Sequence, residues 1–153
     1  MNQIAALLPA SNIIVDLDVA SKPQFFAAVG GLFEHSAGLS QSRVAASLAA
    51  REKLGSTGLG QGIAIPHGRI PHLPAATGAF VRLRAPIAFD APDGKPVDQL
   101  FVLLVPEQAT DQHLQLLSEL AQMFSERTFR ERLSQAQDAQ TVADVFSGWR
   151  SAA

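Results

Sequence analysis

Hydrophobic and polar positions along the chain follow two different spacings, and each spacing predicts one type of element. Short runs that alternate or stay apolar, rich in β-branched residues, are typical of strands. Such runs lie at 12–19, 63–66, 77–84 and 100–105. Apolar residues that recur every three or four positions are typical of helices. This second spacing lies at 22–36, 40–53, 110–125, 126–135 and 138–149. Ser21, Ser40, and either Thr110 or Asp111 are the predicted N-caps.

The order of these elements predicts the fold class. The run at 100–105 contains no polar residue, so we expect a central strand in a sheet whose two faces are both covered by helices. One strand, two helices, several strands and then more helices is not a repeating βαβ order. We therefore expect one α/β domain over residues 1–153, with a mixed β-sheet flanked by helices on both faces.

Composition narrows the classes of function. The chain carries 12 lysines and arginines against 14 acidic residues and has no basic run, so nucleic acid is not an expected partner. It has no cysteine, which excludes disulfides, thiol nucleophiles and cysteine-bound metals. No apolar segment reaches ~18–20 residues and the start lacks a signal-peptide pattern, so we expect a cytoplasmic protein without membrane insertion. Four histidines remain as candidates for chemistry: His35, His67, His72 and His113.

The glycine-rich segment at 55–62 is the first candidate for a binding site. Its four glycines stand at positions 55, 58, 60 and 62, and glycine is found where the backbone needs a positive φ or approaches another group closely. Backbone N–H groups that converge in such a loop bind anions. The alternative is a flexible linker, and neither a P-loop nor a dinucleotide fingerprint matches the spacing.

His67 follows an apolar strand and stands between Pro66 and Gly68. Proline fixes φ, and glycine removes a side chain beside the imidazole. A neutral imidazole held in this way can attack phosphorus. The alternative is a turn histidine that hydrogen-bonds a carbonyl group.

Two further residues are predicted to point inward. His113 lies in a first helical turn at helical spacing from Leu117 and Leu120, so its ring should face the sheet; otherwise it is an ordinary boundary histidine. Arg51 shares a helical stripe with Val44 and Leu48. An inward guanidinium needs an anion, which is either a bound phosphate or a carboxylate such as Glu52 or Asp90.

The other two histidines are expected to have no chemical role. A metal site built from His67, His72 and His113 is conceivable, but no HExxH spacing is present, so we expect neither a metal nor a cofactor. His35 stands near a helix C-terminus, where it can interact with the last carbonyl groups.

The sequence also resembles a known family. Residues 51–58 (REKLGSTG) and 62–68 (GIAIPHG) closely resemble the active-site region of EIIA domains of the bacterial phosphotransferase system. The class is the fructose/mannitol one, which includes the nitrogen-regulatory EIIA proteins. Further matches lie at 86–90, 96–98, 103–106 and 113–118, and the resemblance covers about residues 8–147.

This resemblance implies a mixed sheet flanked by helices and a phosphohistidine carrier without a cofactor. His67 would accept the phosphoryl group from an HPr-type carrier, His113 would stabilise that group, and Arg51 would stabilise its charge. The residues expected to line the binding site are Ser56, Thr57, Gly60, Gly62 and Gly68. An apolar surface made by Leu59, Ile70 and Leu73 would surround His67 and receive the carrier.

Within the family, residues 52–62 and 86–90 look most like the nitrogen-regulatory branch. That branch implies regulatory targets such as a transporter or a sensor kinase. One alternative is a sugar-specific EIIA that passes its phosphate to an EIIB. An alternative of another class is a protein-interaction module that is never phosphorylated.

Overall fold

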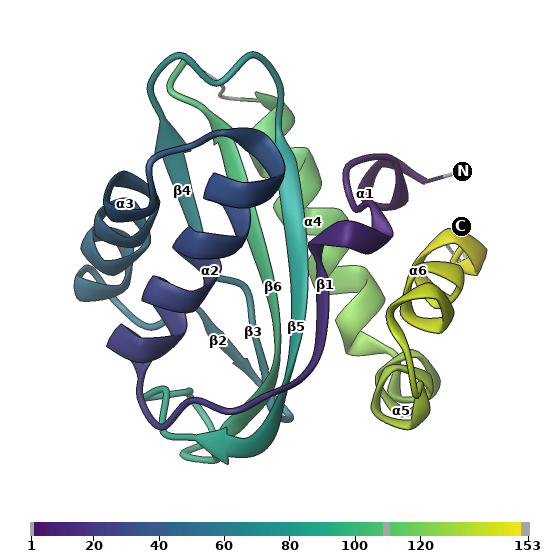
Figure 1. Ribbon diagram of the computed structural model, residues 1–153. Helices are drawn as coiled ribbons and strands as arrows, with labels where there is room; N and C mark the ends of the chain where they lie inside the picture. Colours follow the sequence, from purple (N-terminus) through teal and green to yellow (C-terminus); the bar gives the residue numbers. More distant parts are fainter. Residues whose placement is uncertain (1, 109–110, 151–153) are drawn as a thin grey trace.

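The computed structural model describes residues 2–108 and 111–150 (Figure 1). Its helices are α1 (Gln3–Ala6), α2 (Lys22–Ala37), α3 (Gln41–Lys53), α4 (Asp111–Ser125), α5 (Arg127–Gln135) and α6 (Ala139–Gly148), with a short 3-10 turn at Ala10–Asn12. Its strands are β1 (Ile13–Leu17), β2 (Gly58–Gly60), β3 (Ile63–Ala64), β4 (His67–Ile70), β5 (Thr77–Ile87) and β6 (Val97–Pro106).

The strands form one six-stranded mixed sheet in the order β1-β5-β6-β3-β2, with β4 also paired to β6. β5 and β6 are antiparallel, whereas β1 is parallel to β5. β3 and β4 are both parallel to β6 and take successive stretches of its edge, with Ala64 opposite Leu100 and His67 opposite Leu103. The sheet therefore places His67 beside the buried stretch 99–105 of the central strand.

Helices cover both faces of this sheet, so the predicted fold class is confirmed (Figure 1). On one face α2 and α3 pack through Phe25, Phe33 and Leu48. On the other face α1, α4, α5 and α6 pack around Phe146, whose ring contacts four other phenylalanine rings. The alternating directions of neighbouring strand residues supply both cores.

The region around His67 differs from the sequence-based expectation. A single strand over 63–66 with His67 after it was expected, but the structure has two short strands and His67 is the first residue of β4. Pro66 has no N–H to give to the ladder, although its carbonyl accepts a bond of 3.0 Å from the Leu103 N–H. The proline therefore interrupts the strand directly before the histidine.

Other differences concern the ends of the elements. α1 was not predicted; the Asn2 side chain caps it and also donates to the carbonyls of Phe146 and Trp149, which joins the two ends of the described chain. β2 was expected to be loop. Thr110, one of the two predicted caps of α4, lies outside the described residues.

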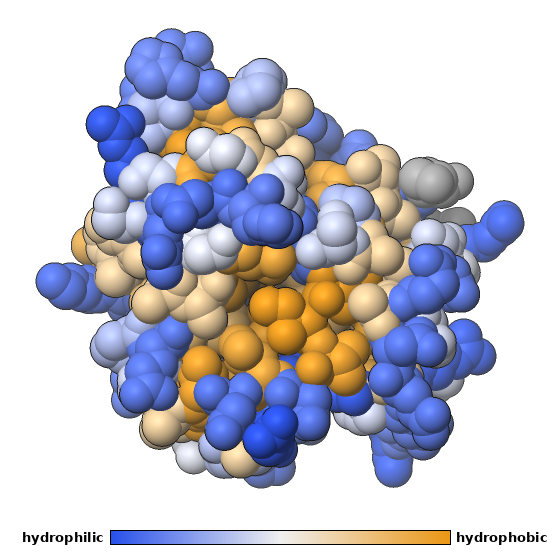
Figure 2. Space-filling view, viewed as in Figure 1, coloured by the Kyte–Doolittle hydropathy of each residue, from blue (hydrophilic) through white to orange (hydrophobic). Residues whose placement is uncertain are grey.

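Figure 2 shows the face that carries α2 and β1, where apolar side chains gather near the middle and hydrophilic ones surround them. Ile14, Leu17 and Leu32 are among the partly buried side chains that pack on the core of this face. Within the described ranges, no helix is long and apolar enough to cross a bilayer.

Candidate functional site

The His67 side chain has a defined orientation and a defined tautomer. Its Nδ1 lies 2.9 Å from the Ile65 carbonyl oxygen, which can only accept, so Nδ1 carries the proton. The Arg51 Nε–H donates to Nε2 at 3.3 Å, so Nε2 is the acceptor nitrogen. Both hydrogen bonds therefore agree that Nε2 holds the lone pair of a neutral ring.

Arg51 reaches His67 from the last turn of α3. Val44 and Leu48 of the same stripe are buried, as the sequence predicted, and Arg51 also donates through Nη1 to the Gly55 carbonyl at 2.9 Å. The two carboxylates considered as alternative partners, Glu52 and Asp90, instead accept from Lys22. Neither carboxylate pairs with Arg51, so the guanidinium charge is available to an anionic ligand bound at His67.

His113 lies in the first turn of α4 and is only 9% exposed. Its ring is 5.2 Å from the His67 ring, centroid to centroid, at an angle of 82°. The buried stripe of α4 continues through Leu116 and Leu120, and Leu117 is partly buried. Three predicted side chains, from α3, β4 and α4, therefore meet at one place.

A cavity of about 210 Å³ opens beside His67. Its lining includes Arg51, Ser56, Thr57, Leu59 and Leu117. No carboxylate is among the lining residues that the structure describes. A guanidinium and a neutral imidazole beside a small hollow suit an anion the size of a phosphoryl group.

The glycine-rich segment is an ordered hairpin of β2 and β3, not a flexible linker. Several of its amide groups already bind oxygen atoms of the protein. The Thr57 N–H donates to Glu52 at 3.2 Å, and the Gln61 N–H donates to Asp93 at 2.9 Å. The Ser56 hydroxyl donates to the Phe89 carbonyl at 2.7 Å. These donors hold the loop in shape.

The three other predicted binding residues lie outside the cavity lining. Gly60 and Gly62 have φ of 93° and 80°, and a Cβ there would lie 3.3 Å and 3.1 Å from carboxylate oxygens of Asp93 and Asp98. At Gly68 a Cβ would overlap the Ser47 side chain, so glycine lets α3 approach β4 closely. Of the five predicted binding residues, only Ser56 and Thr57 line the cavity.

The expected apolar surface is only partly present. Leu59 is 46% exposed, but Ile70 and Leu73 are buried in the core beneath α2 and α3. Ile70 is three residues after His67 in β4, and an odd spacing places it on the opposite face of the strand. Within the described part of the chain, the other large exposed apolar side chains are Leu54 and Leu114. The sequence did not single out either of them, although the place of Leu114 directly after the inward-facing His113 could have indicated an exposed leucine near the site.

His35 and His72 are both exposed and lie in the last turn of α2 and in the turn after β4. His72 has a positive φ of 65°, which is typical of a turn residue. Across residues 2–108 and 111–150, no three side chains of the metal-binding types come together.

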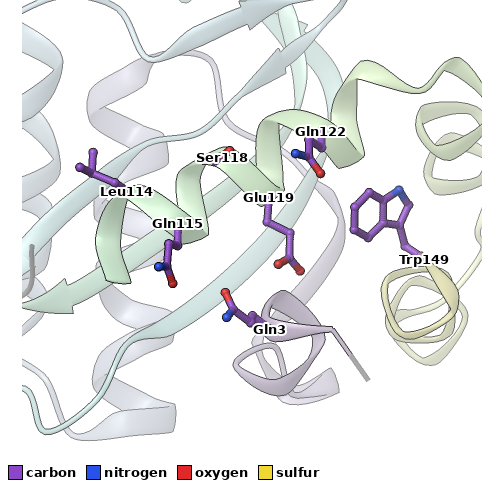
Figure 3. Close-up of a pocket in the computed structure, with 7 residues that line it drawn as sticks. All are labelled: Gln3, Leu114, Gln115, Ser118, Glu119, Gln122 and Trp149. Carbon is purple, nitrogen blue, oxygen red and sulfur yellow. The ribbon is translucent and has the colours of Figure 1, made fainter. Parts of the chain in front are cut away.

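A second hollow lies on the outer side of α4, between α1 and α6 (Figure 3). Its lining includes Gln3, Glu119 and Trp149, and no predicted site residue. Glu119 accepts from the Ile4 N–H, and the Trp149 indole donates to Glu126. The first bond connects α1 to α4, and the second connects the residue after α6 to the residue before α5.

Burial lowers the pKa of both site histidines. The His67 pKa falls because the ring is desolvated and, to a lesser extent, because Arg51 is close, although the hydrogen bond to Ile65 opposes this. The His113 pKa falls through desolvation and then through the charges of His67, Arg69 and Arg51. Both rings are neutral at pH 7, as a nucleophilic Nε2 requires.

We expect both rings to titrate with midpoints below the ordinary histidine value of 6.5, as measured by NMR of the imidazole protons. Because the folded protein binds these protons less readily than the unfolded chain, its free energy of unfolding should fall as the pH drops below about 6.5 and through the lower folded pKa values. Midpoints at or above 6.5 for His67 and His113 would contradict the effect of burial.

Residues 6–148 match the family described as "Phosphoenolpyruvate-dependent sugar phosphotransferase system, EIIA 2". The nitrogen regulatory protein of Pseudomonas aeruginosa is 53% identical over 106 residues, which are 67% of this chain and 69% of that protein. The nitrogen regulatory protein of Bradyrhizobium diazoefficiens is 37% identical over 144 residues, 94% of each chain.

The crystal structure of nitrogen regulatory protein IIA-Ntr from Neisseria meningitidis has the same fold. It superposes with a TM-score of 0.89 at 51% sequence identity, over 94% of this chain and 99% of that one. Sequence, family match and fold agree with the resemblance found in residues 51–68. The chain therefore belongs to the EIIA 2 family of the phosphoenolpyruvate-dependent sugar phosphotransferase system, in its nitrogen-regulatory group.

Proposed function

We propose that this phosphocarrier accepts a phosphoryl group on Nε2 of His67 from an HPr-type carrier protein, and that the modified protein regulates its targets by changing which partners it binds. One observation carries the choice of atom: the Ile65 carbonyl holds the proton on Nδ1, so Nε2 keeps the lone pair beside the cavity. The family membership supports the carrier role.

The chemistry needs little beyond positioning and charge stabilisation. The bond between phosphorus and the donor's imidazole nitrogen breaks as the bond between phosphorus and Nε2 of His67 forms. Positive charge that develops on the ring is shared with Nδ1–H, which the Ile65 carbonyl stabilises. The Arg51 guanidinium, 3.3 Å from Nε2, is placed to bind phosphoryl oxygens once it releases the lone pair.

The remaining predicted residues have supporting roles in this proposal. Ser56 and Thr57 form the cavity wall, and His113 stands edge-on to His67 where it can donate to the phosphoryl group. Gly60, Gly62 and Gly68 act through the shape of the backbone, as their close neighbours indicate.

The proposed regulation rests on charge. The chain has a formal net charge of −2, and a phosphoryl group adds about −1.5 to −2. The exposed side chains of Leu54, Leu59 and Leu114 provide apolar contact area for a partner such as a transporter or a sensor kinase. The phosphoryl group would roughly double the net negative charge of the chain and place the added charge at His67, beside Leu59, which changes which protein surfaces can bind.

The proposal is tested with phosphoenolpyruvate, the first enzyme of the host's phosphotransferase system and its HPr-type carrier. Mass spectrometry at alkaline pH, where phosphohistidine survives, should locate one phosphoryl group on the peptide that contains His67. Label on another residue, or no label with an active donor, would reject the proposal. Transfer from the labelled protein to the host's EIIB domains would instead favour the sugar-transport role.

His113→Ala should slow phosphoryl uptake by about 10- to 100-fold, because a hydrogen bond to a charged group contributes ~1.5–3 kcal/mol. Rapid-quench measurement of the transfer rate checks this. His113→Gln, which keeps a donor and leaves less of a cavity, should be the milder change. Rates equal to that of the unmodified protein in both variants would make His113 a boundary residue only.

A further inference from the structure

Glu52 has a buried carboxylate that the mechanism above does not use. It follows Arg51 in the last turn of α3, and its side chain is only 6% exposed. A carboxylate so deeply buried needs partners for its charge. Its Oε1 accepts from the Thr57 hydroxyl at 2.7 Å and from the Thr57 N–H at 3.2 Å.

From Thr57 a line of hydrogen bonds continues to the reactive ring. The Thr57 carbonyl accepts from the Ile65 N–H at 3.0 Å. The Ile65 carbonyl in turn accepts from Nδ1–H of His67 at 2.9 Å. Glu52 is thus connected to His67 through two backbone residues, on the side of the ring opposite to Nε2.

Lys22 holds the outer oxygen of Glu52. Its Nζ lies 2.8 Å from Oε2 of Glu52 and 3.0 Å from Oδ2 of Asp90, and 4.7 Å from the centre of the Phe89 ring. Asp90 is mostly exposed, with 86% of its side chain open to solvent. The ammonium group therefore orients Glu52 so that Oε1 faces Thr57.

From these contacts we propose that Glu52 is a positioning residue for His67, acting through Thr57 and Ile65. Its charge strengthens the two bonds that Thr57 donates to it, because a hydrogen bond to an ionised acceptor is roughly twice as strong as a neutral one, and these bonds hold Thr57, whose carbonyl accepts from Ile65. The line fixes the Ile65 carbonyl, and the carbonyl fixes the proton on Nδ1 and the direction of Nε2. The inference rests on the proposed function for its consequence, but its structural part can be measured without any phosphoryl donor.

The test compares Glu52→Gln with Asp90→Asn. Both variants remove one carboxylate from Lys22, but only Glu52 contacts Thr57. Asparagine also tolerates the positive φ of 54° at position 90. The two proteins therefore separate the loss of charge at Lys22 from the loss of the line to His67.

We expect Glu52→Gln to slow phosphoryl uptake by about tenfold. The loss of a group that orients a functional histidine costs about 10- to 100-fold, and Glu52 acts on the ring only through other residues, so the low end of that range applies. Nitrogen-15 NMR of the unmodified protein should show only the Nδ1–H form of His67, and Glu52→Gln should add the Nε2–H form. Hydrogen exchange at the Ile65 amide should be faster in this variant. Asp90→Asn should match the unmodified protein in all three measurements.

Thr57→Val removes one bond to Glu52 and keeps the Thr57 amide, so it should shift the same measurements in the same direction but less. If Glu52→Gln does not fold, Thr57→Val alone tests whether the line from Glu52 positions His67. An unchanged His67 tautomer and unchanged Ile65 exchange would overturn the inference, even if the transfer rate fell. Absence of label on His67 in the unmodified protein would reject the proposed function and leave the tautomer result to decide the positioning role.

Discussion

Replacing His67 with glutamine should abolish phosphoryl uptake. Glutamine has no nitrogen with a lone pair that can form a stable bond to phosphorus, whereas Nε2 of His67 is neutral and oriented, in a residue that lines the cavity. The fold should remain intact because position 67 is only half-buried and glutamine still offers an oxygen to Arg51. The measurement is radiolabel transferred from phosphoenolpyruvate through the carrier protein, separated at alkaline pH.

His35→Gln is the matched control for this experiment. It makes the same substitution at an exposed histidine in the last turn of α2, which is not among the residues that line the cavity, and should take up label like the unmodified protein. A circular dichroism melt of each variant checks the fold. Alkali-stable label that persists in His67→Gln would assign the chemistry to another residue and remove the basis of the proposed mechanism.

The parts of the site that the sequence predicted are those governed by spacing within one element. The stripe of Val44, Leu48 and Arg51 places the guanidinium inward, and the position of His113 in its helix places the ring toward the sheet. An unbroken apolar run within β6 predicted helices on both faces. Periodicity carries this information because it fixes which side of a helix or strand a residue occupies.

The parts that were missed depend on contacts between distant segments. The Gln61 amide donates to Asp93, 32 residues further along the chain. The sequence alone therefore left the glycine-rich segment as either an anion-binding loop or a flexible linker, and did not indicate an internal carboxylate partner. Glu52 was considered only as a partner for Arg51, although its neighbour across the loop is Thr57. Ile70 was assigned to the surface because the start of β4 at His67 was not foreseen.

The tautomer of His67 belongs to a third kind of feature, which needs both local and distant structure. Pro66 and the short strand are local, but the carbonyl that fixes Nδ1–H is held by the bond between Ile65 and Thr57. A histidine before glycine in a sequence does not reveal which nitrogen carries the proton. The hydrogen bonds from both sides of the ring supply that assignment, on which the proposed choice of Nε2 as the attacking atom rests.

Arg51→Lys should slow phosphoryl uptake by about 100- to 1,000-fold, the loss found when one strong donor to developing negative charge is removed. Lysine keeps the charge but not the planar fork, so one ammonium cannot bond the Gly55 carbonyl and bind phosphoryl oxygens at Nε2 in the same orientation. Rapid-quench transfer rates from a saturating donor measure the effect. Arg43→Lys, at an exposed position of the same helix, is the control and should transfer at the unmodified rate. If Arg51→Lys also transferred at that rate, a positive charge alone would suffice, and the orientation of the guanidinium seen here would have no part in the reaction.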